Sequence, residues 1–195
     1  MALDIGGIII DTLLDLVEDK GVPLERITVK QLLEASGVSR QTFYNHFLDK
    51  YDLIAKAYDR RIIGEFDVES LPEHFDFREA FLASLERMRK HGTFLQQASR
   101  MTGQNCLTEY ALEHSRAFDL AWHQRQWGEG TMPDALRFAT EYHSMASTYM
   151  TISWILAGFP VSSEELADLT VHMRAMGMDR LFEGASDAGN PYPSG

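Results

Sequence analysis

Apolar residues recur along most of the chain at spacings of three and four, which is the period of an α-helix with one buried face. The segments with this period are about 4–20, 28–36, 39–47, 49–66, 76–91, 93–101, 105–127, 133–157 and 162–182. Glycine, proline and serine separate them, and no stretch of useful length alternates apolar and polar residues. The pattern therefore predicts an all-α protein.

The chain divides into two predicted domains and a tail. Residues 67–76 are expected to form a loop, and Pro72 within it marks the boundary. Before it, residues 1–66 form a small N-terminal domain that ends in a connector helix at about 49–66. After it, residues 67–182 form a larger helical bundle. The final segment, 183–195, is rich in glycine, proline and serine and is expected to be disordered.

The stretch 28–50 predicts a helix-turn-helix. Thr28 with Gln31 forms a capping box at the start of one short helix, and Gly37 suits its end. Ser39 is placed to cap a second short helix, which buries Phe43 and Phe47 on one side. Its other faces carry a guanidinium, an amide, hydroxyls and an imidazole. A short helix that carries these hydrogen-bonding groups suits the major groove of DNA.

The chain is acidic as a whole, but one segment has a positive net charge. The whole chain has a formal net charge of −11, which by itself argues against nucleic acid as a partner. Residues 26–61 are the exception, because seven Lys and Arg face four Asp and Glu there. Positive charge therefore gathers where the predicted motif would meet phosphate. The single cysteine, Cys106, and the lack of a signal or an 18-residue apolar run lead us to expect a cytoplasmic protein without a membrane partner.

The segment T-V-K-Q-L-L-E-A-S-G-V-S-R-Q-T-F-Y-N-H-F-L-D-K-Y-D-L resembles the DNA-binding domain of TetR-family transcriptional regulators. The matching residues are Thr28, Val29, Leu32, Ala35, Gly37, Val38, Ser39, Thr42, Tyr44, His46, Phe47, Lys50 and Leu53. They lie in the first third of the chain. The sequence of this motif is most similar to that of a subgroup that includes regulators of dihydroxyacetone metabolism. The resemblance implies a three-helix DNA-binding domain followed by a helical bundle that dimerises and binds a small-molecule effector or a partner protein.

The resemblance also assigns roles to individual residues. It implies that Thr28, Ser39, Tyr44, His46 and Lys50 contact DNA phosphates. Base contacts are expected from Arg40, Gln41 and Thr42 at the exposed start of the second motif helix. Arginine can pair with guanine and glutamine with adenine. Two long side chains in succession depart from many relatives, which have a small residue at position 41.

A homodimer on a palindromic operator follows from the same resemblance, with the helices 133–157 and 162–182 as the interface. An effector would then act by rotating the connector helix and changing the distance between the two recognition helices. The basic arm that often precedes the first helix in such regulators is absent, and the first helix is acidic. An alternative is therefore a helical interaction protein with a weak or vestigial DNA-binding motif.

The predicted bundle is rich in large, adaptable apolar side chains, which are typical of small-molecule pockets. We expect a pocket from Met101, Tyr110, Phe118, Trp122, Tyr142, Met145 and Tyr149. A Met- and aromatic-rich core without a cavity is the alternative, and the resemblance favours the pocket.

Enzyme and metal chemistry find little support in the sequence. His114 and His123 are nine residues apart and so face opposite sides of one helix, and Cys106 has no CxxC partner. No Gly-rich phosphate loop, G-x-S-x-G or H-E-x-x-H is present. We therefore expect no catalytic residue, no metal and no cofactor. A small-molecule-binding enzyme is the remaining alternative.

Overall fold

The computed structural model describes residues 3–64, 68–72, 75–103 and 106–175. Within these ranges every regular element is helical, which confirms the predicted all-α class. The elements are α1 (Ile5–Leu14), η1 (Asp15–Asp19), η2 (Leu24–Arg26), α2 (Val29–Ser36), α3 (Arg40–His46), α4 (Lys50–Tyr58), η3 (Asp59–Ile63), η4 (Val68–Ser70), α5 (Phe77–Lys90), α6 (Gly92–Arg100), α7 (Leu107–Trp127), α8 (Asp134–Leu156) and α9 (Ser163–Arg174).

The predicted segments correspond closely to these helices, with three differences. The expected helix 4–20 changes from α to π geometry in η1, and the connector helix does the same in η3. The expected loop 67–76 contains one 3-10 turn, η4. The domain boundary at 66/67, the end of the helix 162–182 and the tail 183–195 lie outside the described residues.

Helix starts follow a common rule along the chain. Six N-cap side chains accept a hydrogen bond from the backbone N–H three residues later: Asp4, Thr28, Ser39, Asp49, Asp76 and Ser162. Each cap satisfies a donor that the helix itself leaves free, and such a cap stabilises a helix by about 1 kcal/mol. These short polar residues explain why the helices begin where they do.

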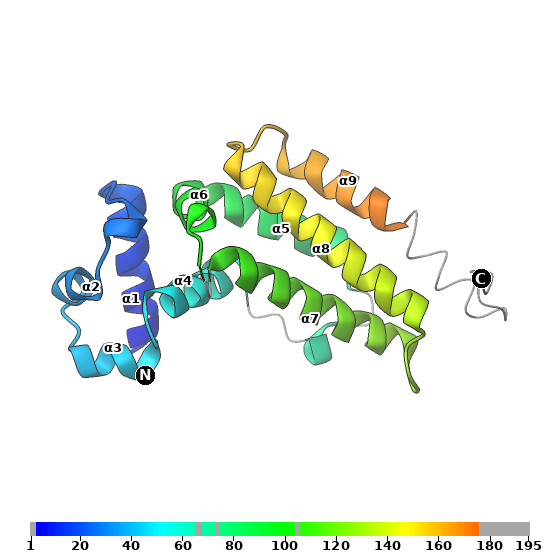
Figure 1. The fold of residues 1–195 in the computed structure, drawn as a ribbon, viewed down its shortest axis with the longest axis horizontal. Coiled ribbons are helices and arrows are strands. Elements are labelled where there is room, and N and C mark those ends of the chain that lie inside the picture. The colour runs from blue at the N-terminus through cyan, green and yellow to red at the C-terminus, as the bar shows by residue number, and fades with distance from the viewer. Residues whose placement is uncertain (1–2, 65–67, 73–74, 104–105, 176–195) are drawn as a thin grey trace.

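The helices form two parts joined by α4. We call α1–α3 the N-terminal unit and α5–α9 the helical bundle. Figure 1 shows the N-terminal unit at one end, α4 leading away from it, and α7 running alongside α8. α7 packs along α8, and α5 packs along α9.

One contiguous apolar core holds both parts together. It extends from Ile9 and Leu13 of α1, through Leu53 of α4, to Phe94 of α6 and Trp154 of α8. Polar contacts cross the same junction. Glu18 Oε2 lies 3.0 Å from His91 Nδ1, and Gln97 Oε1 accepts the N–H of Leu24 at 2.7 Å. The N-terminal unit is therefore fixed to α6 as well as to α4.

Candidate nucleic-acid interface and ligand cavity

The turn between α2 and α3 has the geometry of a helix-turn-helix. Thr28 and Gln31 form both bonds of a capping box at the start of α2. Gly37 ends α2 with φ of +69°, a left-handed conformation that favours glycine. Ser39 Oγ accepts the N–H of Thr42 at 3.1 Å and so fixes the start of α3. The chain thus places α3 immediately after a sharp turn.

Two phenylalanines attach α3 to the rest of the N-terminal unit. Phe43 is fully buried and Phe47 is 3% exposed, and their ring centroids are 5.5 Å apart. With this face buried, Arg40, Gln41, Tyr44 and His46 lie exposed on the surface. The start of α3 is therefore free to meet another molecule.

The predicted contact residues on α3 also touch one another. The guanidinium of Arg40 lies 5.4 Å from the ring centroid of Tyr44, within cation–π range. Ser39 Oγ and Thr42 Oγ1 are 2.8 Å apart and share a hydrogen bond. These contacts orient the side chains of Arg40 and Thr42 in the absence of a partner.

Lys50 and Lys56 have structural partners. Lys50 Nζ donates to the carbonyls of Leu24 and Glu25 at 3.3 and 3.1 Å, and its partial burial lowers the pKa of the ammonium. Lys56, which sequence reasoning did not single out, donates to the carbonyl of His46 at 2.8 Å. A cation at this place matches the partial negative charge of the C-terminus of α3.

Two further basic residues are paired with the acidic first helix. Arg60 bonds Asp4 at 3.0 Å, and Arg61 bonds Asp11. Hydrogen bonds from Gly7 N–H and Arg60 keep the pKa of the Asp4 carboxyl below its usual value. These pairs attach η3 to the start and middle of α1, which gives Asp4 and Asp11 a structural role.

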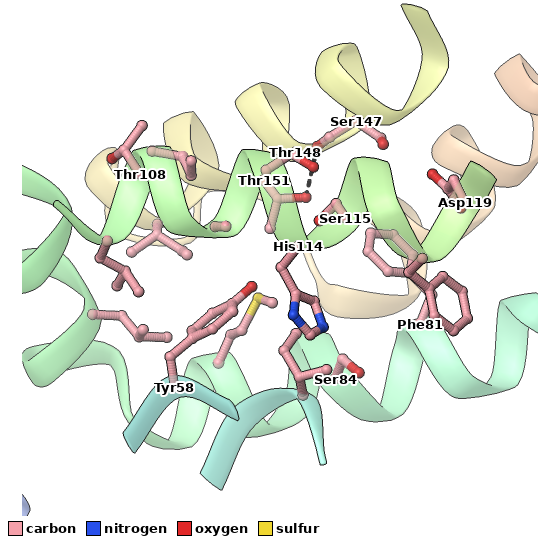
Figure 2. A pocket seen from close by; sticks show the side chains of 18 of the residues that line it. Tyr58, Phe81, Ser84, Thr108, His114, Ser115, Asp119, Ser147, Thr148 and Thr151 are labelled. Carbon is pink, nitrogen blue, oxygen red and sulfur yellow. Dashed lines mark hydrogen bonds between the residues drawn. The ribbon is translucent and has the colours of Figure 1, made fainter. Parts of the chain in front are cut away.

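A cavity of about 130 Å³ opens inside the helical bundle. Its walls come from α4 with η3, α5, α6, α7 and α8, and also include Phe75. Figure 2 shows the His114 side chain reaching into the middle of the cavity, with Tyr58 and Asp119 on opposite sides in that view. Because Tyr58 and Ile63 belong to α4 and η3, the cavity touches the element that carries the N-terminal unit.

Only one of the seven expected pocket residues, Phe118, lines this cavity. Trp122 is buried behind it, with its ring 5.1 Å from that of Phe75, and Met101 packs against the main core. Tyr142, Met145 and Tyr149 are 63%, 52% and 64% exposed and face outward from α8. In their place α8 lines the cavity with Ser147, Thr148, Thr151, Ile152 and Ile155.

The seventh expected residue, Tyr110, lies at the junction between α7 and the end of α4. Its hydroxyl donates to Asp59 Oδ2 at 2.5 Å. Burial and this hydrogen bond raise the pKa of the Tyr110 phenol, and burial also raises that of Tyr58. The other carboxylate oxygen, Asp59 Oδ1, is buried without a hydrogen-bond partner, and His114 Nδ1 lies 3.9 Å from it.

A buried polar network connects α7, α8 and α9. Arg174 Nη2 lies 2.6 Å from His123 Nε2, and Nδ1 of that histidine lies 2.9 Å from Thr140 Oγ1. Because arginine only donates, His123 accepts at Nε2 and carries its proton on Nδ1. Burial, with the charges of Arg174 and His143, lowers the pKa of His123 to about 3. Asp119 lies 3.4 Å from Arg174, yet burial raises the pKa of its carboxyl.

Large apolar side chains remain exposed on α8 and on α9, and we call them together the apolar stripe. Its large members are Phe138, Tyr142, Met145, Tyr149, Met150, Leu156, Leu169 and Met173, each at least 36% exposed. Four of them, at positions 138, 142, 145 and 149, follow the three-and-four spacing of one helical face. A soluble protein seldom leaves so many large apolar side chains together without a partner.

Neither a metal centre nor a membrane span is found in the described part of the chain. No three His, Cys, Asp or Glu side chains there gather closely enough to hold an ion. None of the helices described is both long and apolar enough to cross a bilayer.

Comparison with known proteins gives structural likeness only. No family model matches the sequence, and no curated protein matches it. The dihydroxyacetone kinase operon activator DhaS is similar in structure, with a TM-score of 0.67 and 18% identity over 92% of this chain and 98% of that one. A protein from Syntrophomonas wolfei described as a TetR-family transcriptional regulator has a TM-score of 0.52 and 18% identity, over 89% and 95% of the two chains. The chain therefore has the all-helical fold of these two regulators.

Proposed function

We propose that this protein is a TetR-like transcriptional regulator that binds double-stranded DNA as a homodimer. The observation that carries the proposal is the exposed face of α3. Arg40 and Gln41 project from the start of a short helix whose opposite side is fixed by Phe43. Guanidinium and amide groups in this position match the hydrogen-bond patterns of guanine and adenine in the major groove.

Phosphate contacts would come from the residues around α3. Thr28, Ser39, Tyr44 and His46 are all exposed. Lys50 uses two of its three ammonium hydrogens on the carbonyls of Leu24 and Glu25. We assign the third hydrogen to a DNA phosphate, so that Lys50 would fix η2 and the DNA backbone together.

A second copy of the chain is the partner that we assign to the apolar stripe of α8 and α9. An isologous two-fold interface would bury both stripes and present two α3 helices to one face of the duplex. The preferred operator would then be an inverted repeat whose half-sites lie about one helical turn, ~34–36 Å, or somewhat more apart.

The cavity of the helical bundle is the site that we assign to an effector. A cavity of about this size, lined by apolar groups, is large enough for a molecule such as benzene. Tyr58 and Ile63 form part of its wall and belong to α4 and η3. A ligand that displaced them would move α4 and, through it, the N-terminal unit.

A helical interaction protein is the competing function, and one observation favours it. Arg60 and Arg61 are engaged with Asp4 and Asp11, so their charge is partly offset within the protein. Fewer basic groups then remain to attract DNA.

Binding to random-sequence duplex at increasing salt separates the two functions. A DNA-binding protein should lose affinity steeply, because each phosphate contact releases counterions. Selection from a random duplex library should then yield an inverted repeat. A flat salt dependence, or no binding at low salt, would favour the interaction protein.

A further inference from the structure

The walls of the cavity accept hydrogen bonds and attract positive charge. Among the described residues that line it, none is a lysine or arginine, and Asp119 is the only carboxylate. His114 is the one basic side chain among the described lining residues, and its Nδ1 lies 3.9 Å from Asp59 Oδ1, a buried carboxylate oxygen. An anionic ligand would therefore find little compensation here.

The hydroxyl groups of α8 also favour a ligand that donates hydrogen bonds. Thr151 donates its hydroxyl hydrogen to the carbonyl of Ser147 at 2.8 Å, and Ser147 donates its own to the carbonyl of Ser144 at 3.1 Å. Both hydrogens are thus used within the helix, and the oxygen lone pairs remain to accept. Figure 2 shows Ser147, Thr148 and Thr151 grouped together on α8. A ligand must donate to satisfy these oxygens.

A guanidinium from α9 already lies against two residues that line the cavity, Phe77 and Asp119. The guanidinium of Arg174, from α9, lies 4.2 Å from the ring centroid of Phe77 and bonds Asp119 at 3.4 Å. Phe77 stacks on Phe81 at 5.7 Å between centroids, and both rings line the cavity. Aromatic faces and a buried carboxylate together favour positive charge. The protein's net charge of −11 acts in the same direction.

We propose that the cavity binds a small organic amine, with one ammonium group attached to an apolar body about the size of a benzene ring. The ammonium donates to Asp119 and to the free hydroxyl oxygens of α8, and the apolar body lies among the phenylalanines. The volume of about 130 Å³ is close to that of a cavity that binds benzene. This inference rests on the proposed function, because it names the class of effector for that cavity.

Three probes of matched shape test the ligand class in the full-length protein. Benzylamine, benzyl alcohol and benzoate share one ring and are positive, neutral and negative at neutral pH. In isothermal titration, benzylamine should bind most tightly and at least about tenfold more tightly than benzoate. Benzoate binding as tightly as benzylamine, or no binding by any of the three, would overturn the proposal.

Two variants on α7 test the partner of the ammonium. Asp119→Asn should weaken benzylamine by about tenfold or more and leave benzyl alcohol within about twofold. Glu113→Gln is the matched control, because Glu113 is exposed on the same helix and lies outside the cavity lining. Equal effects of the two substitutions would overturn the role of Asp119.

A variant on α8 serves if Asp119→Asn does not fold. Thr151→Val removes an acceptor oxygen and should still weaken benzylamine binding by about threefold. No loss in that variant would overturn the proposal.

Duplex binding by the same preparation keeps this inference separate from the regulatory function. DNA binding without amine binding would overturn the ligand class alone. Amine binding without DNA binding would overturn the regulatory function and leave the ligand class standing.

Discussion

The hydroxyl of Tyr110 on α7 donates to Asp59 Oδ2 across 2.5 Å, at the first residue of the π-helical turn that ends the connector. The second carboxylate oxygen of Asp59 is buried without a hydrogen-bond partner. Because burial and this hydrogen bond raise the pKa of the phenol, Tyr110 keeps its proton and remains a donor at neutral pH. The bond therefore joins the cavity helix α7 to the end of α4.

Tyr110→Phe should destabilise the protein, because it leaves Asp59 without its donor. The expected loss of unfolding free energy is about 1–3 kcal/mol, measured by urea denaturation at neutral pH. Tyr44→Phe is the control, since Tyr44 is 44% exposed, keeps its ring beside Arg40 and should change the free energy by less than about 0.5 kcal/mol. Equal stability of the two variants would show that the 2.5 Å contact contributes nothing.

Much of the N-terminal unit could be predicted because its determinants are local. Thr28, Ser39 and Asp49 cap helices through bonds that span three residues, and Gly37 acts through its own backbone. Contacts between distant residues left no such pattern. Gln97 accepts from Leu24 across 73 positions, and Glu18 pairs with His91 across the same separation. The residues that surround Gln97 and Glu18 in the sequence are like those around ordinary exposed side chains, so they gave no sign of these contacts.

The cavity was harder to predict because α8 has two apolar faces. Periodicity groups Tyr142, Met145 and Tyr149 on one face, but it does not distinguish a face toward a cavity from a face toward solvent or a partner. The structure places all three outside. The usable signal was the other face, where the small residues Ser147 and Thr151 lie four apart. Small hydroxyl side chains at this spacing leave space that large aromatic residues would fill.

Arg40→Ala should relax the base preference of the protein without abolishing DNA binding. Loss of a bidentate contact to a base costs about 1–3 kcal/mol of discrimination at that position. Selection from a random duplex library, repeated with the variant, would measure this change. Lys30→Ala is the matched control, because Lys30 is exposed on α2 beside Glu34 and should leave the preferred sequence unaltered. An unchanged preference in Arg40→Ala would remove this residue from base recognition.

Lys50→Ala should weaken binding to all duplexes about equally and reduce the salt slope by about one unit. It should also lower stability, because Leu24 and Glu25 lose the ammonium that bonds their carbonyls. Fluorescence anisotropy over a salt series measures the first effect, and urea denaturation measures the second. A loss of stability with an unchanged salt slope would show that Lys50 supports η2 and does not contact phosphate.

Tyr149→Glu should dissociate the proposed homodimer, because a carboxylate would be buried without a partner in the middle of the apolar stripe. The dimer dissociation constant in sedimentation equilibrium is expected to rise by about tenfold or more. Leu48→Glu is the control for added charge on an exposed apolar site, since Leu48 is 80% exposed and lies in the N-terminal unit. A wild-type protein that is monomeric at all concentrations would contradict the interface outright.

Stability should fall with pH below about 6.5, because His123 is held neutral in the folded protein. Its pKa is lowered to about 3 in the fold, whereas the unfolded chain takes up the proton near the ordinary value of about 6.5. The stabilisation is therefore complete above about pH 6.5 and is lost progressively as the pH falls toward 3. The expected loss is on the order of 2 kcal/mol between pH 6.5 and 5. Urea denaturation at several pH values would measure this slope.

His123→Gln should flatten that slope, because an amide accepts from Arg174 and donates to Thr140 without titrating. Some dependence should remain, since burial also lowers the pKa of His143. His172→Gln is the matched control, because this histidine is exposed on α9 and should leave the slope unchanged. If His123→Gln and wild type lost stability in parallel between pH 6.5 and 5, the buried network would not hold His123 neutral. The acid sensitivity would then have to come from other groups.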